Sequence, residues 1–164
     1  MAQTALAISP AAGGQVQISV DMAAWVAIGS NTISIAWSGG DHIVGSTHTL
    51  DGNSAIVTGS NKQNPVTVTV RCVYEDTTDK AFDKIMDQWE AGNGSLGVRW
   101  APEGGIDTVV GNPLYTTTDT AGTAAGELVA VPLPPDADAT SGDPGMFEFS
   151  VTAAKVTRST TTTS

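Results

Sequence analysis

The sequence predicts a mainly β fold with one helix laid on it, and three observations support this. Apolar and polar residues alternate over residues 66–75, with the period of two that is typical of a strand with one buried and one solvent-facing side. The same alternation covers residues 15–22 and 147–153. Between residues 78 and 91 the period changes, because apolar residues return every three to four positions, as on one side of an α-helix.

An arm and a long hairpin loop flank the first strands. Residues 1–14 are small and weakly patterned, with Pro10 as a breaker, so we expect an N-terminal arm that only a partner would order. After the strand at residues 15–22, a further strand is expected at residues 32–37. Residues 38–65 then contain Gly-rich turns with weak strand patterns. They predict a long polar hairpin loop that is either disordered alone or ordered by a neighbouring subunit.

The helix is expected over about residues 78–91. Thr77 or Thr78 suits the N-cap, because a hydroxyl oxygen accepts hydrogen bonds from the free N–H groups at a helix start. Charged residues occupy the side of the helix that faces water. The opposite, apolar side should pack the helix on a sheet, through Phe82, Ile85, Met86 and Trp89.

Shorter strands and a tail are expected in the C-terminal half. Residues 159–164 are a low-complexity run of Thr and Ser, which predicts a disordered C-terminal tail. The single domain would therefore cover residues 15–158. Its remaining strands are expected at residues 96–100, 106–110, 127–133 and 147–153, with either a loop or one weak strand at residues 114–118.

Length and charge restrict the classes of function. The chain of 164 residues is long enough for one domain with a real core. Its net charge of −10, from 17 acidic and 7 basic residues, argues against a protein that grips nucleic acid through the phosphates. No apolar run approaches the roughly 18 residues of a membrane span, and no secretory signal is visible, so the expected compartment is the cytoplasm of the producing cell.

Neither catalysis nor metal binding finds a motif in the sequence. His42 and His48 are the only histidines, with Asp41 and Asp51 nearby, and no third His or Cys completes a ligand set. The only cysteine, Cys72, lies on the apolar side of an expected strand, which is typical of a buried and inert thiol. We therefore assign no catalytic residue, no metal and no cofactor, and expect a protein that is not an enzyme.

Several segments resemble the tail tube (major tail) proteins of long-tailed bacteriophages. The resemblance lies in the order of the elements and in a few short phrases, and it extends over roughly residues 15–158. The closing strand, residues 147–151 (FEFSV), follows an acidic, Pro-containing loop with Gly142-Asp143-Pro144. Before it come residues 70–75 (VRCVYE), 81–89 (AFDKIMDQW) and 96–105 (LGVRWAPEGG).

This resemblance implies an architecture, an assembly and a location. It implies two packed antiparallel sheets, similar to a sandwich or barrel, with a flanking helix. Copies would join into hexameric rings that stack as the tail tube, together with tape measure and terminator proteins. The tube would be built in the host cytoplasm and end up in the virion tail. DNA would pass as cargo that does not stick, which agrees with an acidic chain because carboxylates repel phosphates.

Two candidate surfaces follow. The polar sides of two expected strands would face the lumen, through Gln17, Ser19, Asp21, Thr67, Thr69 and Glu75. Arg71 shares the second of these sides and argues against a purely acidic lining. The hairpin loop would contact the next ring, through His48, Asp51, Asn53, Asn61 and Lys62.

Other classes of protein stay open at this point. One is a surface or secreted β-sandwich module that binds a carbohydrate or a protein, which the Thr- and Ser-rich strands would fit. Such a module would present exposed tryptophans, whereas the four tryptophans of this chain fall on apolar sides of expected elements. Another is a different virion part of similar build, such as a tail terminator or a capsid decoration protein.

Overall fold

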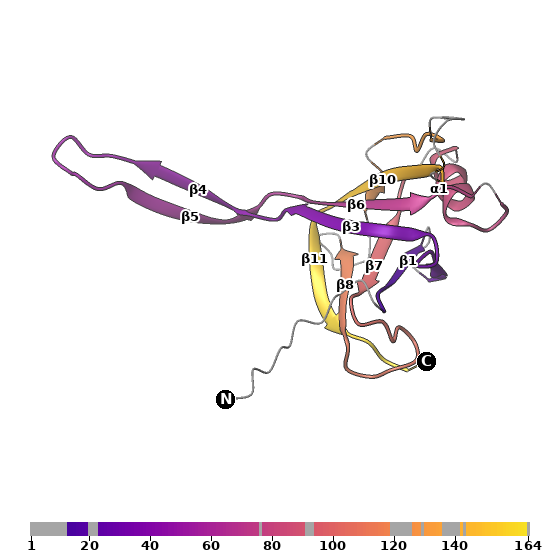
Figure 1. The fold of residues 1–164 in the computed structure, drawn as a ribbon. Coiled ribbons are helices and arrows are strands. Elements are labelled where there is room, and N and C mark those ends of the chain that lie inside the picture. Colours follow the sequence, from indigo (N-terminus) through magenta and orange to yellow (C-terminus); the bar gives the residue numbers. More distant parts are fainter. Residues whose placement is uncertain are drawn as a thin grey trace.

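Two antiparallel sheets, a two-stranded arm and a helix make up the described part of the chain (Figure 1). The structure is a computed structural model that describes residues 13–19, 23–75, 77–90, 94–118, 126–128, 130–135, 142 and 144–163. The elements are β1 (Gln15–Ser19), β2 (Val26–Ala27), β3 (Thr32–Gly39), β4 (His42–Thr47), β5 (Ile56–Gln63), β6 (Val66–Val73), α1 (Ala81–Glu90), β7 (Gly97–Ala101), β8 (Pro113–Thr118), β9 (Glu127–Leu128), β10 (Met146–Ala153) and β11 (Lys155–Thr160).

The strand order defines the two sheets. A five-stranded sheet has the order β11-β8-β7-β1-β2, and a four-stranded sheet has the order β3-β6-β10-β9. β4 and β5 pair with each other and extend away from both (Figure 1). The predicted mainly β fold with antiparallel sheets and a flanking helix is confirmed, and within the described residues no sheet closes into a barrel.

One core lies between the sheets, because the alternation along each strand turns its apolar residues to the same side. The helix covers one end of this core. Cys72 belongs to it, and burial raises the pKa of its thiol, an effect that contact with the Thr32 hydroxyl partly offsets. The buried apolar side chains include Val16, Ile18 and Val98 from the five-stranded sheet, Val68, Val70, Phe147, Phe149 and Val151 from the four-stranded sheet, and Ala81, Phe82 and Ile85 from α1.

The C-terminal residues are part of a sheet, so the expected disordered tail at residues 159–164 is wrong for residues 159–163. The chain passes at Ala154 from β10 in one sheet to β11 in the other. β11 pairs with β8 along its whole length. Thr161 follows and is buried, and its backbone N–H donates to the carbonyl of Asn112 at 2.8 Å. Residue 164 lies outside the described residues.

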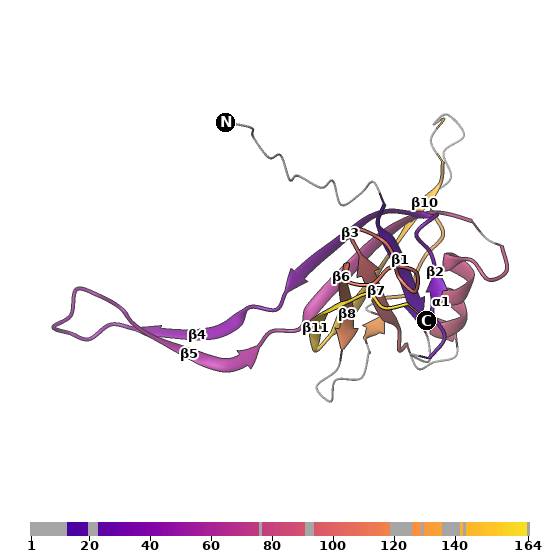
Figure 2. The same cartoon turned by 90° about the horizontal axis from the view of Figure 1, so that it is seen from below.

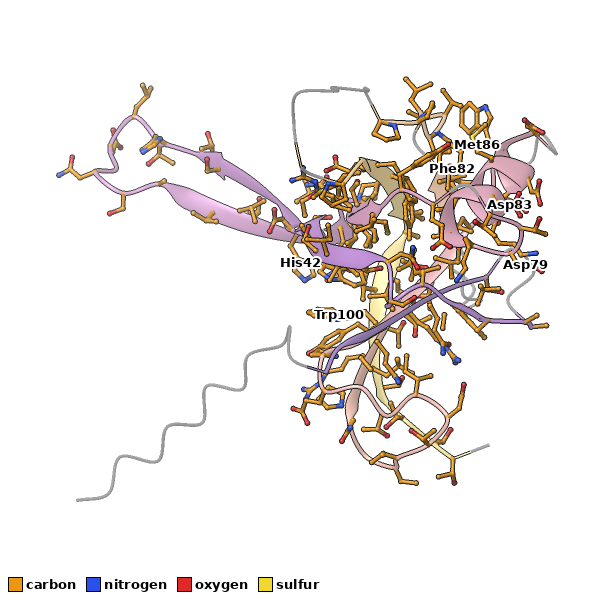
Figure 3. All side chains as sticks on the ribbon, turned by 45° about the vertical axis from the view of Figure 1, so that its right-hand side comes forward. His42, Asp79, Phe82, Asp83, Met86 and Trp100 are labelled. Carbon is orange, nitrogen blue, oxygen red and sulfur yellow. The ribbon has the colours of Figure 1, made fainter. Side chains whose placement is uncertain are left out.

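The helix begins at Ala81, later than the expected residue 78. The chain turns just before it, because Asp79 adopts a positive φ of 68°, a conformation that Asp tolerates better than most residues. The backbone N–H of Asp79 donates to the Asp83 carboxylate at 2.9 Å (Figure 3). The N-cap is Lys80, whose carbonyl accepts from the N–H of Lys84 at 3.0 Å, so the expected cap at Thr77 or Thr78 is wrong. The Asp83 carboxylate fixes the turn that leads into the helix, and its charge suits the positive end of the helix dipole.

The side of α1 that packs on the core differs in part from the expected one. Phe82 and Ile85 are buried, and Met86 is partly buried against the core. Trp89 is 37% exposed, because the buried side of the helix follows residues 81, 85 and 88, and residue 89 lies at the margin of that side. Gln88 is buried instead.

Two expected strands are wrong or shortened. Residues 106–110 form turns, because Asp107 has a φ of 63° and the N–H of Val109 donates to the carbonyl of Gly105 at 2.9 Å. Among the residues of 127–133 that the structure describes, only Glu127–Leu128 form a strand. Pro132 has no N–H to donate to a ladder. Within the described residues, no helix is long and apolar enough to cross a membrane.

Candidate assembly surfaces

The outer face of the four-stranded sheet carries a row of hydroxyl groups. On β6 and β10, the residues that point away from the core are directly opposite one another in the antiparallel register. The Thr67 hydroxyl lies 3.0 Å from that of Thr152, and the Thr69 hydroxyl lies 3.0 Å from that of Ser150. We call these four residues the hydroxyl face.

The charged groups on this face are of both signs. Arg71 is opposite Glu148 in the register of β6 and β10. Glu127 on β9 is opposite Thr152 and therefore points to the same side. All three side chains are exposed. The face is thus polar, with one cation and two anions among these three residues, rather than strongly acidic.

Of the six residues expected to line a lumen, the four that lie in strands are divided between two different sheets. Thr67 and Thr69 belong to the hydroxyl face. Gln17 is on the five-stranded sheet, where its side-chain oxygen accepts from Arg99, and Ser19 is only 1% exposed. At this burial, Ser19 does not reach an open surface of the single chain, in contrast to the expectation for a lumen residue.

The other two residues of that set do not extend the hydroxyl face. Glu75 follows the end of β6, and its carboxylate accepts from the side-chain amide of Asn31 at 3.1 Å. Asp21 lies outside the described residues. Ser150 and Thr152 belong to the face and were not singled out. Their signal was the alternation of residues 147–153, but the pairing of β10 with β6 joins residues about 80 positions apart, and the sequence does not show it.

The arm formed by β4 and β5 projects from the body where β3 ends and β6 begins (Figures 1 and 2). Gly39 and Gly40 at its base have φ angles of 83° and 81°, and a Cβ on Gly39 would collide with the carbonyl oxygen of Pro65. Glycine is needed at this base, because other residues rarely adopt such a conformation. The backbone N–H of Asn64 then donates to the carbonyl of Asp41 at 2.9 Å, which holds the two strands together as they leave the body.

Apolar side chains on this arm are exposed. A two-stranded hairpin is at best marginally stable in water, and this one buries no large apolar side chain of its own. Such a surface is typical of a segment that is covered by a partner. At least 46% of the surface of each of its large apolar residues is exposed, these being Ile43, Val44, Leu50, Ile56 and Val57.

The polar residues expected to contact a next ring are all on the arm. His48, Asp51 and Asn53 lie in the tip between β4 and β5, and Asn61 and Lys62 lie on β5. All five are exposed. The expected loop of residues 38–65 is therefore a hairpin, with strands of six and eight residues that lead to its tip.

A groove opens on the body at the far end of β3 from the arm. It has a volume of about 290 Å³, at the lower end of the range of roughly 300–1,000 Å³ that small-molecule sites occupy. Ile33, 51% exposed, belongs to its lining. The complete lining is Gly14, Val16, Gly29, Thr32, Ile33, Ser34, Ile35 and Trp100, so none of these residues carries a charge.

Three aromatic rings pack together beside this groove. Trp100, labelled in Figure 3, is the middle ring. Trp37 stacks on it with ring centroids 6.1 Å apart, and the Trp100 centroid lies 5.8 Å from that of Tyr115. All three are half-buried, so they do not form the flat exposed platform that a sugar ring needs. The indole N–H of Trp37 is buried without an acceptor among the described residues.

Arg99 ties the loop after β7 to β1. Its Nε donates to the side-chain oxygen of Gln17 at 2.6 Å, and a terminal nitrogen pairs with Asp107 at 3.0 Å. The guanidinium lies over the ring of Trp25, 4.6 Å from its centroid. Burial lowers the pKa of Arg99, and the nearby Asp107 carboxylate partly offsets this. All these partners are structural, and the cluster forms no open site.

The two histidines are not part of a chemical site that the structure describes. The Nδ1 of His42, at the base of the arm (Figure 3), lies 3.3 Å from the carbonyl oxygen of Ser60, and its Nε2 lies 3.2 Å from the side-chain amide of Gln63. His48 is in the tip. Across the described part of the chain, no three His, Cys, Asp or Glu residues gather as metal ligands would.

Comparison with solved structures identifies the class of fold. The chain is similar to a chain of the sheath-tube complex of the PVC extracellular contractile injection system in its extended state, with 14% identity, a TM-score of 0.57, and coverage of 97% of this chain and 99% of that one. It is also similar to a chain of the six-fold symmetrised baseplate of the anti-feeding prophage, with 8% identity, a TM-score of 0.59, and coverage of 97% of both chains.

A third match comes from the virion of a gene transfer agent, with 10% identity, a TM-score of 0.52, and coverage of 91% of this chain and 95% of that one. No protein-family model and no curated protein matches the sequence. At such low identities the likeness is one of fold. The fold is that of chains in phage-like tails and injection systems, and the resemblance to tail tube proteins is confirmed at this level.

Proposed function

We propose that this chain is a structural subunit of a virion tail, which assembles into hexameric rings stacked as a tube that conducts DNA during ejection. Its partners would be further copies of itself and other tail proteins, such as the tape measure and terminator proteins. The tube would be assembled in the host cytoplasm. No catalytic residue, metal or cofactor has a part in this role.

The observation that carries the proposal is the likeness in fold over nearly the whole chain. It covers 97% of the residues for the sheath-tube complex and 97% for the baseplate. Since the likeness includes almost all of each chain, it extends to the arm as well as the body. A six-fold arrangement is supported by that baseplate, and by the tail of an empty gene transfer agent particle with C6 symmetry and a TM-score of 0.50.

The hydroxyl face supports a role as the lining of a tube. A wall of hydroxyls with mixed charges offers DNA no array of cations to bind, so phosphates would pass without being held. The net charge of −10 adds a repulsive background. We therefore assign the lumen to the face that carries Thr67, Thr69, Ser150 and Thr152.

The edges of the same sheet support closure into a ring. β3 is at one edge of the four-stranded sheet and β9 is at the other. An open edge invites pairing with another chain, and a ring in which each copy pairs with the next removes every such edge. The hydroxyl face would then be continuous around the bore.

Negative-stain electron microscopy of the purified protein over a concentration series tests the proposal. We expect rings with six subunits at low concentration and hollow tubes at high concentration. Growth on added tail-tip complexes serves as a second condition for a tube that needs an initiator. A protein that stays monomeric under both conditions contradicts the proposal and favours the alternative of a ligand-binding β-sandwich module.

The position of the hydroxyl face predicts the effect of a cation placed there. In Thr69→Lys, each ring would gain a circle of ammonium groups in the bore. Assembled tubes of this variant should retain a short DNA duplex in a co-sedimentation assay at low salt, and release it as salt rises, because phosphate contacts weaken with ionic strength. Wild-type tubes should retain none.

Thr157→Lys is the matched control. The Thr157 hydroxyl also lies close to another hydroxyl, that of Thr118 at 2.9 Å, but it belongs to the five-stranded sheet. Both variants thus lose one hydroxyl pair and gain one charge. If tubes of Thr157→Lys hold DNA inside and tubes of Thr69→Lys do not, the five-stranded sheet lines the bore.

A further inference from the structure

We infer that the arm of one copy docks, through the side that carries Val44 and Val57, into the groove between β1 and β3 of a copy in the adjacent ring. This inference rests on the proposed stacking of rings and names the surface that receives the arm. Both surfaces belong to the same chain, so the occupant of the groove is a second copy.

The arm offers an apolar side of defined composition. In the register of β4 and β5, Val44 is opposite Gly59 and Ser46 is opposite Val57, so Val44 and Val57 point to one side. These valines are 57% and 63% exposed. Where residues 44–47 pair with residues 56–59, the other two residues on this side are Ser46 and Gly59, which are small and leave this stretch flat enough to enter a narrow groove.

The groove matches this side in polarity and charge. Its apolar lining comes from Val16, Ile33, Ile35 and Trp100. Residues 42–63 contain one Asp and one Lys, so the arm is neutral when its histidines are neutral, in a chain of net charge −10. Two acidic copies repel each other least where the two surfaces that meet carry no net charge. The arm and the groove are two such surfaces.

The arm and the groove lie at opposite ends of β3, so copies joined through them would stack along the direction of the arm. β3 runs from Thr32 to Gly39, and the groove is lined by residues at its beginning, whereas the arm leaves from its end. Figure 2 shows the arm projecting from one end of the body, opposite to the end that bears α1. A second copy displaced along the direction of the arm would therefore present the beginning of its β3, and the groove, to the arm of the first.

A contact of this kind builds an assembly that can be extended without limit. Donor and receptor lie at different places on the chain, so the contact is heterologous and each bound copy leaves a free arm at one end and a free groove at the other. Because arm and groove are separated along β3, this repetition runs along the strand and not around a closed ring. The inferred contact thus accounts for growth of a tube by rings.

A charge exchange tests the inference. Ile33→Asp places a carboxylate at the mouth of the groove, and Val57→Lys places an ammonium on the docking side of the arm. Each single variant should raise the protein concentration needed for tubes by at least about tenfold, because an unpaired charge would be buried in the contact. The double variant Ile33→Asp with Val57→Lys should recover most of this loss.

The matched control is the double variant Ile33→Asp with Val57→Asp, which has charges at the same two positions and should not recover. Both residues are more than half exposed, so every variant should keep the wild-type melting temperature. Val110→Asp, at a site that is 68% exposed and belongs neither to the arm nor to the groove lining, should leave tube formation unchanged.

Disulfide trapping gives a readout that is independent of tube stability. An equimolar mixture of Ile33→Cys protein and Val57→Cys protein, oxidised during assembly, should give a linked pair, because sulfurs join only when the Cα atoms lie within roughly 7 Å. The native Cys72 is buried and its raised pKa disfavours the reactive thiolate, so it should not compete.

Three results would overturn the inference. If the wild-type protein and Ile33→Asp form tubes at the same protein concentration, the docking is refuted and the proposed function stays intact. Recovery in both double variants shows that the two positions do not meet. If removal of residues 2–12 raises the protein concentration needed for tubes tenfold and Val57→Lys does not change it, the groove receives the N-terminal segment instead of the arm. Wild-type protein without rings or tubes instead contradicts the proposed function itself.

Discussion

A protein in which residues 42–63 are replaced by Asn-Gly is expected to fold with a nearly unchanged melting temperature and to form no tubes. The arm buries no large apolar side chain against the body, so its loss should cost the body little. Asp41 and Asn64 already lie side by side through their backbone hydrogen bond of 2.9 Å, and Asn-Gly suits a two-residue turn between them. Calorimetry and electron microscopy measure the two effects.

The same variant should also act as a chain terminator. A copy without an arm still has a groove, so it can receive a wild-type arm but cannot extend the tube further. Mixed in at a small fraction, it should shorten wild-type tubes in proportion to its share. Tubes of normal length made from the armless protein alone would show that the arm has no part in stacking.

Phe82→Ala is expected to lower the free energy of unfolding by about 3–5 kcal/mol, the usual cost of removing a buried aromatic ring. Phe82 is 7% exposed and lies edge-on to Tyr74 at 4.8 Å and to Phe147 at 5.3 Å between ring centroids. Its removal would therefore open a cavity between α1 and the four-stranded sheet. Urea denaturation, with an unchanged slope between the variants, measures the loss.

Trp89→Ala is the control on the same helix. Trp89 is the larger residue, but 37% of its surface is already in water, so its loss should cost about 1 kcal/mol, which is typical of point mutants in general. Equal losses for the two variants would mean that Trp89 becomes buried, for example under a neighbouring copy. Urea denaturation at protein concentrations too low for assembly shows whether Trp89 is buried within the single copy or under a neighbouring copy.

The fold was predictable where it depends on local pattern. The alternation over residues 66–75 and 147–153 correctly predicts β6 and β10, and the apolar stripe correctly predicts α1. β11 was missed, since Val156 is the single large apolar residue in it and its neighbours resemble a Thr-rich tail. That strand is held by its pairing with β8, a tertiary interaction that overrides local composition.

The candidate surfaces were predictable only in part, because strand pairing decides them. Gln17 and Thr67 both lie on polar sides of strands, and the sequence treats them alike. In the structure they belong to different sheets, and the hydroxyl partner of Thr67 comes from β10. The groove was not predicted for the same reason, since it brings together β1, β3 and Trp100 of β7. The arm was predicted, because its turns and weak strands are contiguous.

The continuity of the arm with β3 and β6 has a mechanical consequence. A force that pulls on the arm runs along the axes of these two strands and into β10, which pairs with β6 over eight residues. A force parallel to the strands loads all the backbone hydrogen bonds between them at once. A force perpendicular to the strands would instead open these bonds one after another. A string of such subunits, joined arm to groove, would resist stretching through its sheets and would fail first at the side-chain contacts between copies.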